Sequence, residues 1–274
     1  QYQTKFQIMK KPTLKPTTMT LRITLSRLAW IDLQVWKIRS PLQGPLADDK
    51  YNWYTNYGDF AGSNSNDQGL EPPLRMRWAR RLEGTVKHLP VCGGGRLYTH
   101  TAEGQIIAVE QDTGRLLWRR YWPDVYLSFT SPLYVDGKLL VPQGGIKRSL
   151  IRCLDASTGK LLWEYPFPHK THNQNMPTPS FNKGRVLVGA ENRGLHAFEP
   201  KLENGKWTVK AYWSHRKVAL NMSSAVVNDG RLYGLSHLKR GRLFCADSHT
   251  GEVLWEGPER AGENVTFLAF PGHV

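Results

Sequence analysis

Four side chains with amide or hydroxyl groups stand at matched places in this sequence, eight or nine residues ahead of a glycine. They are Ser128, Asn175 and Asn221, each nine residues before Gly137, Gly184 and Gly230, and Asn264, eight residues before Gly272. If the four stretches fold alike, these groups form a polar ring at which a ligand or a partner peptide could bind through hydrogen bonds. The alternative is that each side chain satisfies the backbone of its own turn.

Histidines and cysteines are the other side chains that could hold a metal ion or attack a substrate. His169 and His172 are three residues apart and could share a metal ion, but no third ligand accompanies them, which favours a solvated loop. Cys92, Cys153 and Cys245 stand singly, and neither zinc-ligand spacing nor a nucleophile elbow nor a phosphate loop is present. The sequence therefore predicts no catalytic residue, no cofactor-binding residue and no metal ligand.

These residues lie in a chain that repeats itself. Five tryptophans follow one another at intervals of 40, 45, 50 and 42 residues, namely Trp78, Trp118, Trp163, Trp213 and Trp255. A Thr-Gly pair precedes three of them at a constant offset, as Thr113 and Gly114, Thr158 and Gly159, and Thr250 and Gly251. The aspartates near these pairs, Asp112, Asp155 and Asp247, are predicted to bind the backbone amides of their own turns.

The repeat length and its glycines predict the fold. Units of 40 to 50 residues with glycine turns and short apolar runs indicate four-stranded propeller blades, since helical repeats would need long segments of 3.6-residue period. In one unit the strands are predicted at Leu133–Asp136, Leu139–Pro142, Leu150–Asp155 and Lys160–Tyr165. The fold class is therefore all-β: a β-propeller of four-stranded antiparallel blades, with about four complete blades and partial blades at both ends.

The run from Cys153 to Trp163, with its acidic residue, its Thr-Gly pair and its tryptophan, resembles the tryptophan-docking repeat of the pyrroloquinoline-quinone (PQQ) like β-propellers. The resemblance covers roughly residues 74 to 274. It implies that each tryptophan packs between neighbouring blades and that the Thr-Gly pair makes the last hairpin of a blade. The third copy departs from the pattern after Glu199, which predicts a lengthened hairpin with Trp213 still docking.

The resemblance implies two kinds of function. Some members are quinoprotein dehydrogenases that oxidise alcohols or sugars with PQQ and calcium, and others are binding scaffolds without a cofactor, such as an outer-membrane assembly lipoprotein. The resemblance implies adjacent cysteines in many of the dehydrogenases, although some lack them, and this chain has none. The sequence therefore favours a noncatalytic scaffold without a cofactor, with the PQQ- and calcium-dependent dehydrogenase kept as the alternative.

The chain is predicted to fall into three parts. Residues 1 to 50 form a basic, irregular extension, residues 51 to 73 form a lead-in loop, and residues 74 to 274 carry the repeats. Blades are predicted at about 86–122, 127–167, 174–216 and 221–258, with a partial blade at 264–274. An incomplete ring leaves strand edges and apolar faces exposed, which suggests a fragment of a longer protein.

The charge bears on partners and location. A net charge of +14 is spread along the chain, and its arginine clusters fall next to docking tryptophans, which favours solvated outer strands over nucleic-acid binding. The predicted partner is another protein or peptide at the propeller face, with an anionic membrane surface also compatible. No export signal or transmembrane segment is visible, and the resemblance implies a periplasmic or cell-surface location.

Overall fold

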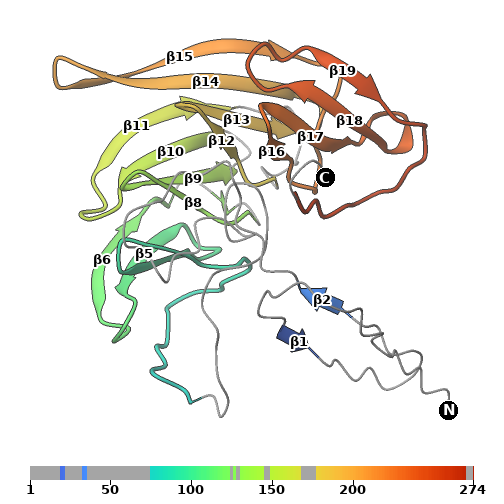
Figure 1. The fold of residues 1–274 in the computed structure, drawn as a ribbon. Helices are drawn as coiled ribbons and strands as arrows, with labels where there is room; N and C mark the ends of the chain where they lie inside the picture. The colour runs from blue at the N-terminus through green and yellow to red at the C-terminus, as the bar shows by residue number, and fades with distance from the viewer. Residues whose placement is uncertain are drawn as a thin grey trace, which may run out of the picture. The chain divides into compact units, whose positions relative to one another are not determined.

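The computed structural model describes residues 19–21, 33–35, 75–123, 126–127, 130–144, 149–167, 177–269 and 274, which form two compact units (Figure 1). In the first unit, Gln1–Arg39, strand β1 (Met19–Leu21) pairs antiparallel with β2 (Leu33–Val35). The second unit, Ser40–Val274, contains all the repeats. The boundary near residue 50 remains a prediction.

Four antiparallel sheets make up the described part of the second unit. The first contains β3 (Val91–Gly93), β4 (Arg96–His100), β5 (Gln105–Glu110) and β6 (Leu116–Tyr121). The second contains β8 (Leu133–Val135), β9 (Lys138–Gly144), β10 (Leu150–Asp155) and β11 (Leu161–Pro166), with β7 (Tyr126–Leu127) also paired to β9. The third contains β12 (Ser180–Asn182), β13 (Arg185–Ala190), β14 (Gly194–Glu203) and β15 (Lys206–His215). The fourth contains β16 (Val226–Asn228), β17 (Arg231–Ser236), β18 (Arg242–Asp247) and β19 (Val253–Glu256).

Apart from β7, which pairs with β9 and skips β8, the strands follow sequence order within each of these sheets, so each sheet is a meander of hairpins. This confirms the predicted all-β fold of four-stranded blades, and the strands predicted in the second blade are found within two residues of their predicted bounds. Within the described residues the one helical piece is the 3-10 turn η1 (Leu238–Arg240). None of the described helices is long and apolar enough to cross a membrane.

Two kinds of turn explain why the residues fold this way. The hairpin between the first two strands of a blade needs two left-handed residues, as at Asp136 (φ 46°) and Gly137 (φ 70°). The hairpin between the last two strands closes with the amide of Gly159 donating to the carbonyl of Asp155 over 2.8 Å, with Gly159 at φ 69°. Glycine adopts such angles without the clash that a Cβ atom brings, and aspartate tolerates them, which is why these residues recur at the turns.

Apolar side chains from neighbouring blades interdigitate, because successive residues of a strand point to opposite faces. Between the first two blades lie Tyr98, Ala108, Trp118, Leu139 and Leu154, all nearly or fully buried. Similar clusters fill the second and third interfaces. Each interior blade is therefore buried on both faces, and its stability depends on its neighbours.

The cysteines fit this packing. Cys153 and Cys245 are fully buried in their strands, and Cys92 is half-buried. All three are free cysteines. Burial raises the pKa of the Cys92 thiol to about 11, so this side chain is a poor nucleophile at neutral pH.

The third blade carries the lengthened hairpin that the sequence predicts. Strands β14 and β15 are 10 residues each, against 6 in β10 and β11, and they stay paired from Leu195 to Glu203. The distal part, residues 199–210, forms a two-stranded ribbon that Figure 1 shows extending past the other strands. Its side chains Trp207 and Val209 pack against the core between the second and third blades. The ribbon therefore covers its neighbour instead of ending in a tight Thr-Gly turn.

Candidate functional site

The predicted polar ring is only half within the described residues. Asn221 is half-buried in the bend before β16, and Asn264 is exposed in the stretch after β19. Ser128 and Asn175 lie outside the described residues, as do His169 and His172. The ring remains a prediction, and the described residues nearest to it in sequence make a different set of contacts.

Buried hydroxyl groups connect the first strands of successive blades. The hydroxyls of Thr130 and Thr178 are 3.0 Å apart, and the Ser224 hydroxyl accepts a 2.9 Å hydrogen bond from the amide of Thr178. The Ser223 hydroxyl likewise accepts from the amide of Val265 over 2.8 Å. These groups form a hydroxyl ladder that crosses from the second blade to the stretch beyond the fourth. Its members bond to one another, so they stabilise the junctions between blades.

Sequence analysis missed this ladder because it compared the blades only at nine residues before each glycine. Thr178 and Ser224 of the ladder stand six residues before Gly184 and Gly230, and Thr130 adjoins Ser131 at the same offset from Gly137. Ser131, Thr178 and Ser224 all carry a hydroxyl at this offset. All three are buried, at 4%, 6% and 5% exposure. Alignment at nine residues instead selects amides that are half-buried or exposed where the structure describes them.

Two stacked histidines continue the ladder into the first blade. His88 and His100 have ring centroids 3.6 Å apart and planes inclined by 23°. The Nε2 atom of fully buried His100 lies 2.8 Å from the carbonyl oxygen of Thr130, so this nitrogen donates and Nδ1 carries the lone pair. Among the described residues Nδ1 has no hydrogen-bond partner. The arrangement therefore requires a neutral His100.

Burial and then the neighbouring His88 lower the pKa of His100 to about 3, which makes the fold sensitive to acid. The unfolded chain binds this proton near pH 6.5 and the folded chain does not, so stability falls as the pH drops from 6.5 towards 3. One such group contributes about 1.4 kcal/mol per pH unit. We expect urea titrations to show about 2 kcal/mol lost between pH 7 and pH 5 from this residue alone.

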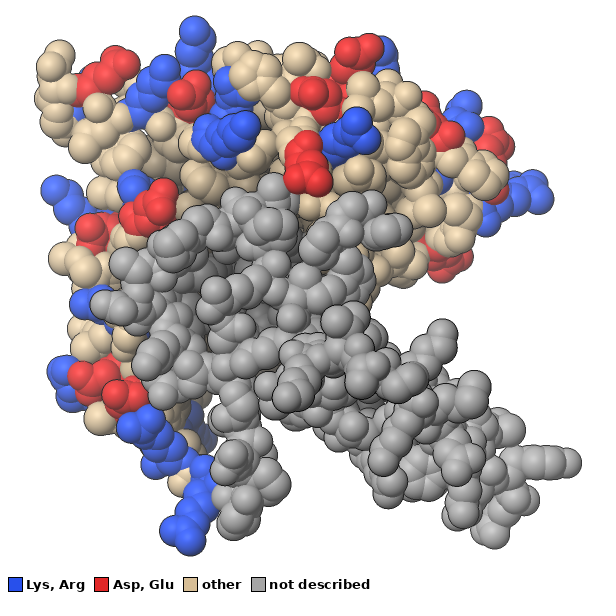
Figure 2. Space-filling view, viewed as in Figure 1, with Lys and Arg blue, Asp and Glu red and all other residues tan. Residues whose placement is uncertain are grey.

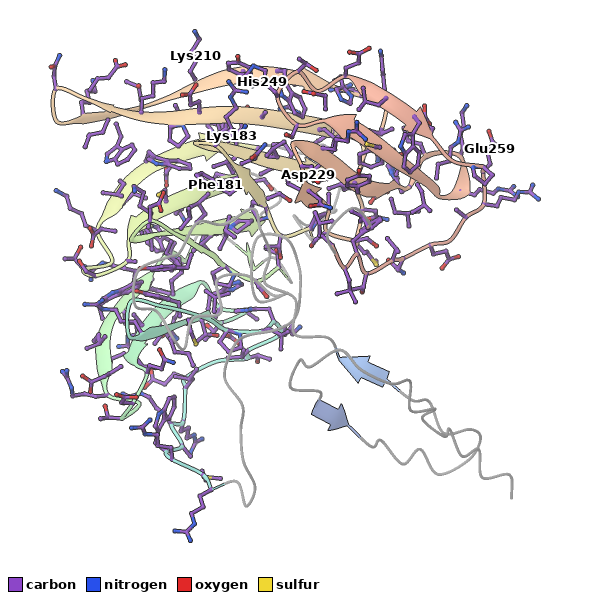
Figure 3. The ribbon with its side chains drawn as sticks, in the orientation of Figure 1. Phe181, Lys183, Lys210, Asp229, His249 and Glu259 are labelled. Atoms are coloured by element: carbon purple, nitrogen blue, oxygen red, sulfur yellow. The ribbon has the colours of Figure 1, made fainter. Side chains whose placement is uncertain are left out.

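The matched variants for this prediction are His100→Phe and His249→Asn. Phenylalanine keeps the stacked ring but does not titrate, so its unfolding free energy should depend less steeply on pH than that of the parent chain. His249 is exposed in a turn of the fourth blade (Figure 3), so His249→Asn is a control that removes a histidine without removing a buried ring. Equal slopes for the parent chain and His100→Phe would show that His100 is not the acid-sensitive group.

The tryptophans of the repeat rest on the glycines of the next turn. A Cβ atom added to Gly114 would lie 2.5 Å from the ring of Trp78, and one added to Gly159 would lie 2.7 Å from the ring of Trp118. Gly251 meets Trp213 in the same way, at 2.5 Å. The bare Cα atom is therefore needed for close approach of the indole ring as well as for the left-handed backbone.

Hydrogen bonds fix two of these rings. The indole N–H of Trp78 donates to the carbonyl of Gln111, and that of Trp118 donates to the carbonyl of Ala156, both over 2.9 Å. In each case the acceptor stands three residues before the glycine. Thr113, Thr158 and Thr250 are exposed in these turns, where the Thr158 and Thr250 hydroxyls bond to the acidic residue of the same turn.

Trp163 and Trp255 differ from this arrangement. The third blade has no Thr-Gly turn, and Trp163 instead meets Phe198 edge to face with centroids 5.8 Å apart. Its indole N–H has no partner among the described residues. Trp255, in the last strand of the fourth blade, is 47% exposed. The described structure thus contains three rings on glycines, one ring on an aromatic core and one exposed ring.

An arginine two residues after the tryptophan adds a second contact. Arg80 donates to the carbonyl of Gly114 over 3.1 Å, and Arg120 donates to the carbonyls of Gly159 and Thr158 over 2.9 and 2.8 Å. Arg80 and Arg120 are exposed, as predicted for a solvated charged face, and they also bind the backbone of the next turn. The sequence signal was a Trp-x-Arg triplet, present twice.

A buried arginine lies between the first and second blades. The side chain of Arg152 is 1% exposed, and its Nε atom is 2.6 Å from a carboxylate oxygen of Glu164. Its guanidinium also donates to the side-chain oxygen of Gln143 and lies 4.5 Å from the ring centre of Trp122. Register places Ile107, His196 and Phe244 at the equivalent position of the first, third and fourth blades. The second blade therefore holds a buried arginine where the first and fourth blades are apolar.

The acidic residues of the repeat serve their own turns. One carboxylate oxygen of Asp155 accepts bonds from the Ser157 hydroxyl (2.6 Å) and from the Thr158 amide (2.8 Å), which holds the pKa of Asp155 below its usual value. Asp247 is held in the same way, chiefly by the Thr250 amide. Asp112 instead forms an exposed ion pair with Arg77. Among the described residues no group of three His, Cys, Asp or Glu side chains is placed to hold a metal ion.

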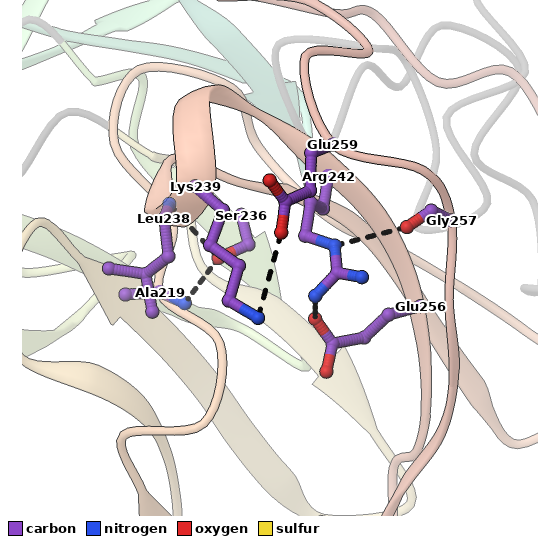
Figure 4. A network of polar contacts seen from close by, with 8 residues as sticks. All are labelled: Ala219, Ser236, Leu238, Lys239, Arg242, Glu256, Gly257 and Glu259. Atoms are coloured by element: carbon purple, nitrogen blue, oxygen red, sulfur yellow. Dashed lines mark hydrogen bonds and ion pairs between the residues drawn. The ribbon is translucent and has the colours of Figure 1, made fainter.

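The stretch after the fourth blade is tied to the turn at η1, as Figure 4 shows. Arg242 forms a 2.9 Å ion pair with Glu256 and donates to the carbonyl of Gly257 over 3.0 Å. Lys239 lies 3.7 Å from Glu259. Lys239 of this turn and Arg242 of β18 are therefore each paired with a carboxylate, Glu259 after β19 and Glu256 at its end.

Comparison with known proteins supports the repeat assignment. Residues 75–257 match a family model described as outer membrane protein assembly factor BamB. The chain is 24% identical over 185 residues to the protein of that name from Burkholderia pseudomallei, covering 67% of this chain and 45% of the relative. It is 31% identical over 78 residues to the quinohemoprotein alcohol dehydrogenase ADH IIB of Pseudomonas putida, covering 26% of this chain and 11% of the relative. The chain thus spans less than half the length of either relative.

A solved structure shares the fold. The crystal structure of BamB from Moraxella catarrhalis superimposes with a TM-score of 0.51 at 19% identity, over 66% of this chain and 51% of that one. At this identity the likeness shows the fold alone. Both comparisons place the four described sheets among propellers built from PQQ repeats.

Proposed function

This chain belongs to the PQQ-repeat family described as outer membrane protein assembly factor BamB, and from that membership we propose that it is a noncatalytic propeller scaffold that binds another protein or peptide. We further propose a periplasmic or cell-surface location for it. The two relatives compared above divide between an assembly factor and a quinone-dependent dehydrogenase, so the family alone leaves both activities open.

One observation supports the scaffold over the enzyme. The recurring polar side chains of the repeat are engaged in structure: Asp155 and Asp247 bind their own turns, and the hydroxyl ladder bonds to itself. A quinone with calcium needs carboxylate and amide oxygens that face a common space. The carboxylates of Asp155 and Asp247 are already committed to backbone amides. The binding surface proposed for the scaffold is the predicted ring of Ser128, Asn175, Asn221 and Asn264.

The alternative is a PQQ- and calcium-dependent dehydrogenase that oxidises alcohols or sugars. The specific observation in its favour is the identity shared with the Pseudomonas putida quinohemoprotein alcohol dehydrogenase. In that case PQQ would accept the electrons of the substrate, and calcium would polarise the quinone. The chain's own contribution would be the blade framework around these groups.

Titration with PQQ and calcium separates the two functions. We expect no saturable quenching of tryptophan fluorescence and no dye-linked oxidation of ethanol or glucose by the folded chain. Quenching with turnover would overturn the scaffold. The surface is tested separately by a photocrosslinking residue at Asn221 or Asn264, with the same residue at exposed Glu252 as control. Crosslinks to a protein or peptide that form only from positions 221 and 264 would support the ring. Crosslinks that form equally from position 252 would refute it.

A further inference from the structure

Arginines gather along one edge of the first blade, where the chain before β3 runs beside β6. Arg77 pairs with Asp112 over 3.0 Å, Trp78 rests on Gly114, and Glu83 pairs with Arg119 over 2.9 Å. These contacts hold residues 75–83 against the turn and the outer strand of the blade. We call residues 75–83 and 110–121, brought together in this way, the arginine edge.

The arginine edge carries a marked excess of positive charge. Residues 75–83 and 110–121 contain seven arginines, no lysine and three acidic residues, an excess of four positive charges. The ribbon of the third blade, residues 199–210, has three lysines and two glutamates, an excess of one. Figure 2 shows Lys and Arg side chains along the margin where β6 and the stretch before β3 lie in Figure 1. The excess of positive charge is therefore larger on the arginine edge than on the ribbon.

Contacts within the described residues neutralise only part of this charge. Arg75 and Arg81 are exposed and make no hydrogen bond or ion pair with the described residues. Arg80 and Arg120 donate to neutral carbonyl groups, so their charges remain uncompensated. The three acidic residues are each paired to one arginine, Asp112 to Arg77, Glu110 to Arg115 and Glu83 to Arg119.

Exposed apolar side chains stand among the arginines. Met76 is 84% exposed between Arg75 and Arg77, and Tyr121 is 59% exposed directly after Arg120. A flexible methionine and an amphipathic tyrosine suit the boundary between lipid headgroups and acyl chains, where an apolar body is buried and a polar tip stays wet. Guanidinium groups bind phosphate oxygens through paired hydrogen bonds.

We propose that the arginine edge binds the surface of a membrane that contains anionic phospholipids. The first blade would lie against the headgroups with Met76 and Tyr121 inserted at the interface, and the remaining blades would point away from the surface. This binding needs no transmembrane segment and no PQQ, so it is independent of the function proposed above. It also gives the chain a defined orientation from which the propeller face meets its partner.

Vesicle co-sedimentation of the 274-residue chain tests the proposal. We expect binding to vesicles of phosphatidylcholine with phosphatidylglycerol, weak binding to phosphatidylcholine alone, and loss of binding at high salt. The double variant Arg75→Gln with Arg81→Gln should bind roughly 10- to 30-fold more weakly, since each basic residue near an anionic surface contributes about fivefold. Lys206→Gln with Lys210→Gln removes the same charge from the ribbon and should change binding less than about twofold.

Soluble polyanions separate a lipid surface from other acidic partners. Met76→Gln should weaken binding to the anionic vesicles and leave binding to poly-glutamate or to a short DNA duplex unchanged. Three results would overturn the proposal: no binding to anionic vesicles at low salt, equal losses in the two double variants, or tighter arginine-dependent binding to the duplex than to vesicles. The two arginine replacements leave every described hydrogen bond intact, so weaker binding would not come from unfolding.

Discussion

Replacement of Trp118 by alanine is expected to lower the free energy of unfolding by about 3–5 kcal/mol. The Trp118 ring is 8% exposed and lies over Gly159. Glycine has no side chain that could fill the space left by the ring. Its removal opens a cavity between the first and second blades and leaves the carbonyl of Ala156 with only the 3.2 Å hydrogen bond from the Tyr98 hydroxyl among the described residues. Urea titration followed by circular dichroism measures the change.

Trp255→Ala is the matched control for this variant. It removes the same side chain from the same repeat position, but this ring is 47% exposed in the described structure. We expect a loss of about 1 kcal/mol, because less apolar surface returns to water and no indole hydrogen bond is broken. Equal losses at both positions would mean that contact with the next turn contributes little to stability.

Removal of the carboxylate from Glu164 is expected to have the second largest effect, a loss of about 3 kcal/mol. The side chain of its partner, Arg152, is 1% exposed and cannot reach water. Among the described residues, the guanidinium would then keep only the neutral side chain of Gln143 and the face of Trp122. Glu164→Ala would therefore leave a buried charge without a counter-charge, and urea titration measures the cost.

Two further variants decide whether the buried charge is the cause. Arg152→Ile combined with Glu164→Ala should recover more than half of the loss, since Ile107 occupies the equivalent place in the first blade. Glu256→Ala, which breaks the more exposed pair with Arg242, should cost only about 0.5 kcal/mol. If the double variant is as unstable as Glu164→Ala, lost packing rather than the charge explains the effect.

The blades were predictable because their signals are local. A glycine whose backbone must be left-handed, such as Gly159, marks the position of a turn in the sequence. The spacing of the tryptophans gives the length of the repeat unit. The long third hairpin was visible in the same way, as a copy without Thr-Gly. These features depend on residues a few positions apart, so one sequence is enough to detect them.

Contacts between blades were not predictable from the same signals. His88 and His100 meet Thr130 of the next blade, and Arg152 meets Trp122 of the previous one. The local sequence does not indicate which faces of two strands will be in contact. At the position of Arg152 the alternation of the strand favours an apolar residue. The same limit explains why the polar ring was aligned on amides and the hydroxyl ladder was missed.

The ribbon of the third blade offers a site for engineering. The turn at Asn204 and Gly205 lies at the far end of strands longer than in other blades, and Trp213 still rests on Gly251. The third blade thus already accommodates a longer hairpin and keeps its contact with the fourth blade. An epitope or a fluorophore grafted between Asn204 and Gly205 should therefore report on the propeller without disturbing it.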